Sequence, residues 1–135
     1  MTLSIVERGA FALALLLATP AMAQHSQNWT TCVNGTRAFS ADAAIGACTE
    51  LIHSNGDKPS RLYAALTNRG ISHYEMKDYD RAIADYTAAI EISPTGRVFY
   101  ARGYTYKHIG QVAKGDADLA QAEKLGYKGP PDRPA

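Results

Sequence analysis

The sequence has almost no excess of charge of either sign. Lysine and arginine total 14 residues and aspartate and glutamate 13, which gives a formal net charge of +1 at pH 7. A charge balance this close to neutral gives no reason for the chain to attract nucleic acid or an anionic membrane surface. We therefore expect neither of these as a partner.

Residues that would form a catalytic or metal site are also lacking. The sequence contains no evident carboxylate pair, phosphate-binding loop or cluster of metal-binding side chains, and its four histidines are scattered. An activity has to be argued from a site. We therefore expect a protein that is not an enzyme, with no catalytic residues, cofactor or metal; an enzyme of unrecognised type is the less favoured alternative.

The N-terminal apolar run, residues 10–18, is shorter than the roughly 20 residues that a membrane-spanning helix needs. It follows Arg8 and precedes the small-residue trio 21–23, which is the layout of a bacterial secretory signal peptide. We predict a signal over residues 1–23 that is cleaved before Gln24, with retention as an uncleaved anchor as the alternative. The mature protein would then be periplasmic or secreted, with no stable membrane span.

Cysteine is scarce, and both copies, Cys32 and Cys48, follow the predicted signal. There is no C-x-x-C motif for redox exchange and no C-x-x-C-H motif for haem attachment. A zinc site completed by His25 and His53 would lack the usual paired spacing of its ligands. Two cysteines in an oxidising compartment instead predict one disulfide, Cys32–Cys48.

What the sequence does contain is helical periodicity between residues 66 and 94. One set of mostly apolar residues recurs at steps of one and three, as on one face of an α-helix: Tyr79, Ala82, Ile83, Tyr86, Ala89 and Ile90. Leu66, Gly70 and Tyr74 stand one turn apart on a preceding helix. Asp78 lies between the two, where its carboxylate can accept from the free N–H groups that begin the second helix.

These residues resemble the tetratricopeptide repeat. The family pattern places a glycine and an aromatic residue on its first helix, and alanine, an aromatic residue, a second alanine and a closing proline on its second. The matching positions are Gly70, Ala82, Tyr86, Ala89 and Pro94, and Leu66 replaces the family's tryptophan. The resemblance implies an antiparallel pair of helices that stacks on neighbouring pairs.

The pattern returns about one repeat length later. Gly70 and Gly103 are 33 residues apart, close to the family's 34. The second copy is carried by Phe99, Gly103, Tyr106, Leu119 and Ala122. A helix of similar spacing covers residues 40–54. Its partner helix is mostly missing, because too few residues of 24–39 have a helical period and Asn34-Gly35 indicates a turn.

We therefore expect an all-α fold, a short solenoid of about two and a half repeats. Its domain covers residues 40–126. A segment that the disulfide holds, 24–39, precedes it, and a disordered tail rich in glycine and proline, 127–135, follows it. At least three repeats are usually needed for stability, so the disulfide or association with another chain would have to supply the difference.

Two arginines occupy a position that the family fills with leucine, immediately before the two glycines. Arg69 and Arg102 should therefore face the partner helix, where a buried guanidinium needs a carboxylate. An aspartate follows 16 residues after each, which predicts the internal salt bridges Arg69–Asp85 and Arg102–Asp118. The alternative is that the arginines lie along the surface with their stems packed.

The resemblance implies a module that binds a protein or peptide along its first helices. The predicted partner site consists of the side chains beside the packing face of these helices: Thr67, Asn68, Ile71, Tyr74, Tyr100, Tyr104 and Lys107. Tyrosines suit recognition, although some could instead pack between repeats. We expect an adaptor or scaffold of the cell envelope, or alternatively a structural subunit that self-associates by stacking its repeat ends.

Overall fold

The computed structural model describes residues 20–54 and 58–130, with only the backbone described at 34–37. These ranges contain six α-helices and no strand: α1 Pro20–Ala38, α2 Ala41–Ser54, α3 Pro59–Glu75, α4 Tyr79–Ile92, α5 Gly96–His108 and α6 Val112–Lys124. The predicted all-α class is confirmed.

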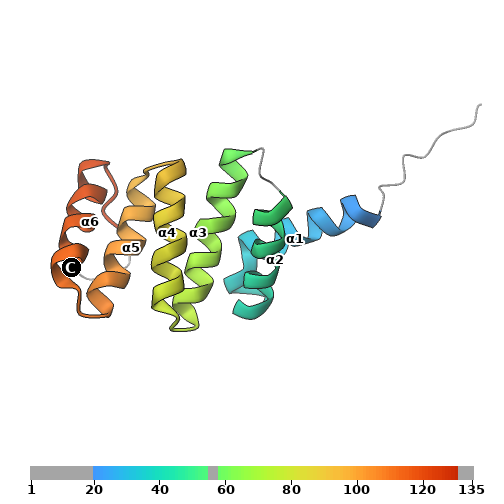
Figure 1. Cartoon of the computed structure of the whole chain (residues 1–135), viewed down its shortest axis with the longest axis horizontal. Helices are drawn as coiled ribbons and strands as arrows, with labels where there is room; N and C mark the ends of the chain where they lie inside the picture. The colour runs from blue at the N-terminus through green and yellow to red at the C-terminus, as the bar shows by residue number, and fades with distance from the viewer. Residues whose placement is uncertain (1–19, 55–57, 131–135) are drawn as a thin grey trace, which may run out of the picture.

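The helices form three hairpins, α1–α2, α3–α4 and α5–α6, which stand side by side in chain order (Figure 1). Successive hairpins pack on each other through α2 on α3 and α4 on α5, and the first helices α1 and α3 also touch. Contact between neighbouring units only is the arrangement of a helical-repeat solenoid. The first turns of α1 project beyond the stack (Figure 1).

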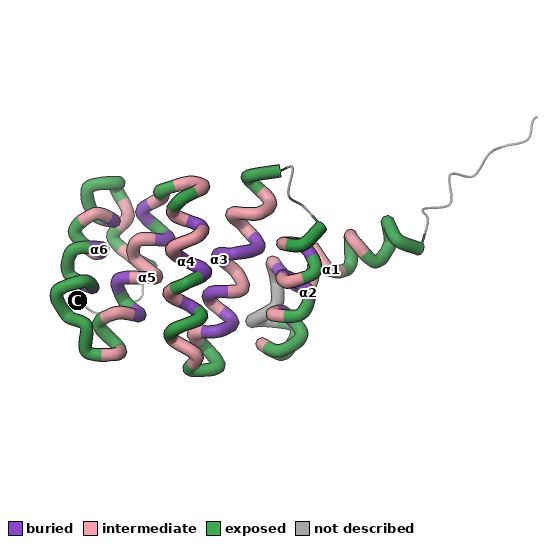
Figure 2. Tube along the Cα trace, viewed as in Figure 1, coloured by how far each residue is buried: buried purple, intermediate pink, exposed green. Residues whose placement is uncertain are grey.

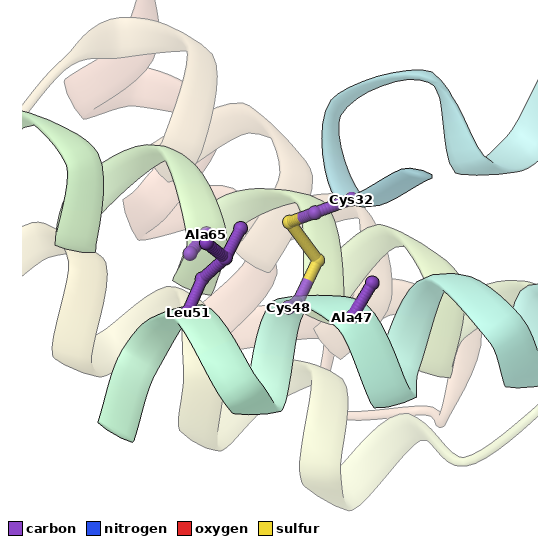
Figure 3. Packing of buried hydrophobic residues seen from close by; sticks show 5 residues of the cluster. All are labelled: Cys32, Ala47, Cys48, Leu51 and Ala65. Atoms are coloured by element: carbon purple, nitrogen blue, oxygen red, sulfur yellow. A yellow bond between two sulfur atoms is a disulfide. The ribbon is translucent and has the colours of Figure 1, made fainter. Parts of the chain in front are cut away.

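The first hairpin is complete, which corrects the expected count of two and a half repeats. Helix α1 spans 19 residues and includes the Asn34-Gly35 pair for which the sequence predicts a turn. The sequence of α1 lacks a regular apolar stripe, and tertiary contacts stabilise the helix instead. Cys32 of α1 forms the predicted disulfide with Cys48 of α2 (Figure 3), and Trp29 packs against the same cluster.

The buried apolar side chains form two clusters along the stack, and Figure 2 shows buried positions where helices face one another. The first cluster joins α1, α2 and α3 through Cys32, Ala47, Cys48, Leu51 and Ala65. The second joins α3, α4 and α5 through Leu66, Ala82, Tyr86, Ala89 and Val98. All but Val98 of the second cluster are positions of the repeat pattern, so the pattern identified most of this core.

Two glycines of the pattern allow close approach of the helices. A Cβ atom at Gly70 would lie 2.6 Å from Cε1 of Tyr86, so this ring fits only against a bare backbone. A Cβ atom at Gly103 would lie 2.9 Å from the carbonyl oxygen of Gly115. The other pattern positions differ in burial. Ala122 is buried and Pro94 is exposed, whereas three are half-buried: Phe99, Tyr106 and Leu119.

The turn between α3 and α4 follows the sequence prediction. The carboxylate of Asp78 accepts a hydrogen bond from the backbone N–H of Arg81 at 3.3 Å, which satisfies one of the free donors at the start of α4. Asp78 is therefore the N-cap that the sequence indicates.

The disorder predicted for the whole of 127–135 does not extend to its first four residues. Gly126 adopts a φ of +81° and ends α6, and the N–H of Tyr127 donates to the carbonyl of Ala122 at 2.9 Å. The ring of Tyr127 then meets that of Tyr100 edge-on, with centroids 5.4 Å apart. An aromatic partner on α5 thus orders this segment, while residues 131–135 lie outside the described residues.

Most of the predicted signal, residues 1–19, also lies outside the described residues. Its last positions, 20–23, are exposed and form the first turn of α1. None of the helices in the described ranges has both the length and the apolar character needed to cross a bilayer.

Candidate partner-binding groove

A groove lies between α3 and α5, and Tyr86 of α4 contributes to its lining. It encloses about 310 Å³, a size typical of ligand-binding clefts. Its lining comes from three helices and the C-terminal segment: Ile71, Tyr74, Glu75, Tyr86, Arg97, Tyr100, Ala101, Tyr104, Thr105, Tyr127 and Pro130. Apart from Glu75, Arg97 and Thr105, these side chains are apolar or aromatic.

Four tyrosines form a continuous tyrosine row along the groove: Tyr74, Tyr104, Tyr100 and Tyr127. Their successive ring centroids are 6.1, 6.3 and 5.4 Å apart. Helical spacing explains the row, because Tyr100 and Tyr104 are one turn apart on α5 and Tyr74 meets them from α3. Such a row can offer both ring surface and hydroxyl groups to a ligand.

An aromatic cluster extends the row beyond Tyr74. Tyr79, at the start of α4, packs edge-on against Tyr74 with centroids 5.4 Å apart. The ring of His108 lies 4.8 Å from that of Tyr79 and 5.8 Å from that of Tyr74. The sequence does not assign His108 to this surface, since only the stacking of hairpins brings the end of α5 to the start of α4.

Four of the seven predicted partner residues line the groove: Ile71, Tyr74, Tyr100 and Tyr104. Thr67 does not, because it is buried and its hydroxyl donates to the carbonyl of Tyr63 at 2.8 Å. The amide of Asn68 donates to the carbonyl of Ala64 at 2.8 Å, so its polar group also serves its own helix. Lys107 instead pairs with a carboxylate of α6 at 2.9 Å.

Both predicted internal salt bridges are present, with matching geometry. Arg69 donates through Nε and Nη2 to the two carboxylate oxygens of Asp85, at 2.9 and 2.7 Å. Arg102 does the same to Asp118, at 2.7 and 2.9 Å. Both aspartates are buried. The hydrogen bonds to Asp118 raise the pKa of Arg102 above its ordinary value, so this arginine stays charged.

The remaining nitrogen of each guanidinium, Nη1, reaches the preceding hairpin. Nη1 of Arg69 donates to the hydroxyl of Thr49 in α2 at 3.1 Å, and Nη1 of Arg102 donates to that of Thr87 in α4 at 3.0 Å. Each arginine thereby joins three helices. The sequence does not reveal the threonines, because they lie 20 and 15 residues before their arginines, with no constant spacing.

Burial shifts the pKa of ionisable groups near these contacts. Nε2 of His73 lies 3.9 Å from Oδ2 of Asp85, yet the pKa of His73 is lowered, because desolvation outweighs the attraction of the carboxylate. Burial also raises the pKa of Tyr86 above its ordinary value. The walls of the groove desolvate the carboxyl of Glu75 and raise its pKa, although the residue as a whole is exposed.

In the part of the chain that the structure describes, no three His, Cys, Asp or Glu side chains gather closely enough to hold a metal ion. The groove therefore offers contact surface, hydrogen-bonding groups and two charges of opposite sign at Glu75 and Arg97. Such a combination can recognise a chain segment through shape and polarity.

Comparison with known proteins agrees with this fold. Residues 63–95 match the family model described as tetratricopeptide repeat. A solved structure named MamA AMB-1 is similar over 80% of this chain and 56% of its own, with a TM-score of 0.63 and 16% identity. That likeness is one of fold, and this chain spans little more than half the length of its neighbour. No curated protein matches the sequence.

Proposed function

We propose that this chain, a tetratricopeptide-repeat protein, is a non-catalytic module that binds an extended segment of a partner protein in the groove between α3 and α5. The repeat fold supports a role in protein–protein interaction. The observation that carries the proposal is the tyrosine row, which lines a groove of about 310 Å³. Tyrosines of this kind are enriched where proteins make energetically important contacts.

An extended segment suits the groove because of what its walls provide. The rings of Tyr100 and Tyr104 stack with an interplanar angle of 11°, which gives a flat apolar surface on α5. Tyrosine loses little rotamer entropy on binding and keeps a hydroxyl for the unpaired backbone groups of an extended chain. Glu75 and Arg97 add one charge of each sign, which would fix the direction of the bound segment.

We further propose that the module is exported and acts as an adaptor or scaffold in the bacterial cell envelope. The Cys32–Cys48 disulfide supports this location, because such bonds persist in oxidising compartments. The exposed first turn of α1 supports cleavage before Gln24, because its removal would leave the packed part of the hairpin intact. The test is the mass of the protein recovered from envelope fractions, which should correspond to residues 24–135 with the disulfide.

Substitution of an exposed groove tyrosine tests the binding role. Tyr104→Ala should reduce partner capture from an envelope extract, quantified by mass spectrometry, by about tenfold or more, as expected for a contact worth roughly 1.4 kcal/mol. Phe39→Ala is the matched control, because Phe39 is an exposed aromatic residue outside the groove, 44% exposed against 36% for Tyr104. Helicity and melting temperature should change little in either variant.

Two results would contradict this role. Equal capture by Tyr104→Ala and the wild type would place the binding surface elsewhere. Unfolding of Tyr104→Ala would assign the tyrosine to the core. The alternative, self-association by end-to-end stacking, finds less support, since Lys114, Asp116 and Lys124 are exposed on the last helix, α6. Concentration-independent size in solution is expected.

A further inference from the structure

The C-terminal segment of the chain is directed into the groove. Gly126 turns the backbone at the end of α6, and Tyr127 then packs on Tyr100 of α5. Close packing fixes this course, because a Cβ atom at Gly96 would lie only 2.6 Å from Cβ of Tyr127. The segment therefore lies against the start of α5 and next to the tyrosine row.

Gly129 continues the same course. Its φ of +90° is one that side chains rarely adopt, and a Cβ atom there would lie 2.8 Å from two ring carbons of Tyr100. Only glycine allows the backbone to lie this close to the tyrosine ring in this conformation. The next residue, Pro130, is part of the groove lining. The described residues thus end at the wall of the groove.

The five residues that follow have the composition that an aromatic groove binds. They are Pro131, Asp132, Arg133, Pro134 and Ala135. Prolines favour the polyproline II conformation, which is already extended and which docks against aromatic side chains at low entropic cost. Asp132 and Arg133 also carry the charges that complement Arg97 and Glu75 of the lining.

Residues 131–135 are long enough to reach along the tyrosine row. Five residues of polyproline II helix span about 15 Å, at roughly 3.1 Å per residue. From Tyr100 the ring centroids step 6.3 Å to Tyr104 and a further 6.1 Å to Tyr74. Residues 131–135 can therefore run past Tyr104 and reach Tyr74 from the position of Pro130.

We propose that residues 131–135 lie in the groove along the tyrosine row, so that this proline-rich segment of the same chain competes with the partner segment. The occupancy of the groove is inferred from the contacts of Tyr127 and Gly129 with Tyr100. The competition with a partner rests on the proposed function. A tethered segment has an effective concentration of about 1 mM, so an intrinsic Kd of about 0.1 mM would weaken partner binding roughly tenfold.

Fluorine NMR of the full chain labelled with 3-fluorotyrosine tests the occupancy. The variant Pro131→Ser/Pro134→Ser removes the polyproline preference, and Arg133→Glu reverses the charge that would face Glu75. Each should shift the signals of Tyr74 and Tyr104 relative to the wild type. The signals of Tyr63 and Tyr106, which do not line the groove, should stay unchanged. Lys128→Ser is the control substitution before the docking segment.

A synthetic peptide of residues 127–135, added to the Pro131→Ser/Pro134→Ser chain, should return the Tyr74 and Tyr104 signals toward their wild-type positions. Identical signals in the wild type and both tail variants would overturn the proposal. A wild-type shift that grows with protein concentration would also overturn it, because the occupant would then be the tail of a second copy.

The outcome for the partner separates this inference from the proposed function. Pro131→Ser/Pro134→Ser should capture about tenfold more partner than the wild type at limiting concentration. Tail-dependent tyrosine signals with unchanged capture would show the tail in the groove and the partner elsewhere, so the proposed function would fail. If partner capture depends on Tyr104 but the tyrosine signals are the same in the wild type and the tail variants, the inference is overturned and the proposed function stands.

Discussion

Each of the two internal arginines contacts a carboxylate of its own hairpin and a threonine of the preceding one. For Arg102 these partners are Asp118 and Thr87. The arrangement fixes the register of successive hairpins, because a slide of one hairpin would leave a half-buried guanidinium without a partner. Leucine at this position would bury more apolar surface but could not select one register.

Removal of one partner should therefore cost far more than removal of both together. Arg102→Ala and Asp118→Ala should each lower the free energy of unfolding by about 3 kcal/mol, because each leaves a buried charge unpaired. The double variant should lose clearly less than the sum, measured by urea unfolding. Thr87→Val removes the acceptor of Arg102 Nη1 and the hydroxyl's own bond to the carbonyl of Ile83, so it should lose about 1–2 kcal/mol.

The exposed pair Lys107–Asp116 is the matched control for this cycle, since its donor–acceptor distance is also short, at 2.9 Å. Its coupling energy should be below about 1 kcal/mol, because water solvates both partners. Purely additive losses for Arg102 and Asp118 would mean that the buried pair behaves like a surface pair.

His73 should make the protein less stable at mildly acidic pH. Its folded-state pKa is lowered by burial, so below the ordinary value of 6.5 the unfolded chain binds the proton first. Stability is therefore highest above pH 6.5 and falls as the pH drops from there toward the folded-state pKa. The facing charges, Asp85, Asp78, Arg69 and Arg81, partly cancel and leave desolvation dominant.

Melting temperatures between pH 7.5 and 5.0 measure this effect. His73→Asn should reduce the loss of stability on acidification, because asparagine does not titrate. His53→Asn is the control, since His53 is exposed. An unchanged pH profile in His73→Asn would show that other groups cause the acid sensitivity.

At the scale of elements, α1 depends on tertiary contacts rather than on an amphipathic pattern of its own. Its sequence has little amphipathic pattern, yet it pairs with α2 through the disulfide and through Trp29. Most of the stability of a helix in a protein comes from tertiary packing of one face rather than from intrinsic propensity. The covalent bond therefore replaces part of the apolar contact that α3 and α5 make through their own repeat residues.

Reduction should release α1 selectively. Closing a loop of 16 residues stabilises the folded state by about 3 kcal/mol in the chain-entropy description, so a reducing agent should lower the melting temperature. Hydrogen exchange should accelerate in α1 before α3–α6. A Cys32→Ala/Cys48→Ala variant should not respond to the reductant. Two reactive thiols in the native, unreduced protein would contradict the prediction.

At the scale of the whole molecule, the complete first hairpin, α1–α2, explains how so short an array is stable. Three stacked repeats are the usual minimum, and α1–α2 supplies the one that the sequence pattern leaves incomplete. The stack also creates the groove, since α3 and α5 belong to different hairpins and neither forms a concave surface alone. The proposed partner binding and folding are thereby linked, because both need hairpins α3–α4 and α5–α6 in register.

The sequence by itself determined the elements whose signals are local or strictly repeated. The period of Ala82, Tyr86 and Ala89, and the 33-residue return of Gly70 at Gly103, predicted two hairpins. The equal spacing of Arg69–Asp85 and Arg102–Asp118 predicted two internal pairs for the same reason. Each signal spans less than one repeat or recurs at a fixed interval, so it can be recognised in the sequence without a structure.

Only the tertiary structure decided the contacts that cross from one hairpin to the next. Packing on α2 makes α1 a helix despite its weak pattern, and it lets Arg69 reach Thr49. Stacking also buries Thr67, which the sequence assigned to the partner surface, and brings His108 to Tyr79. These outcomes depend on the lengths of the connecting loops and on the angles between helices, which no single helical period encodes.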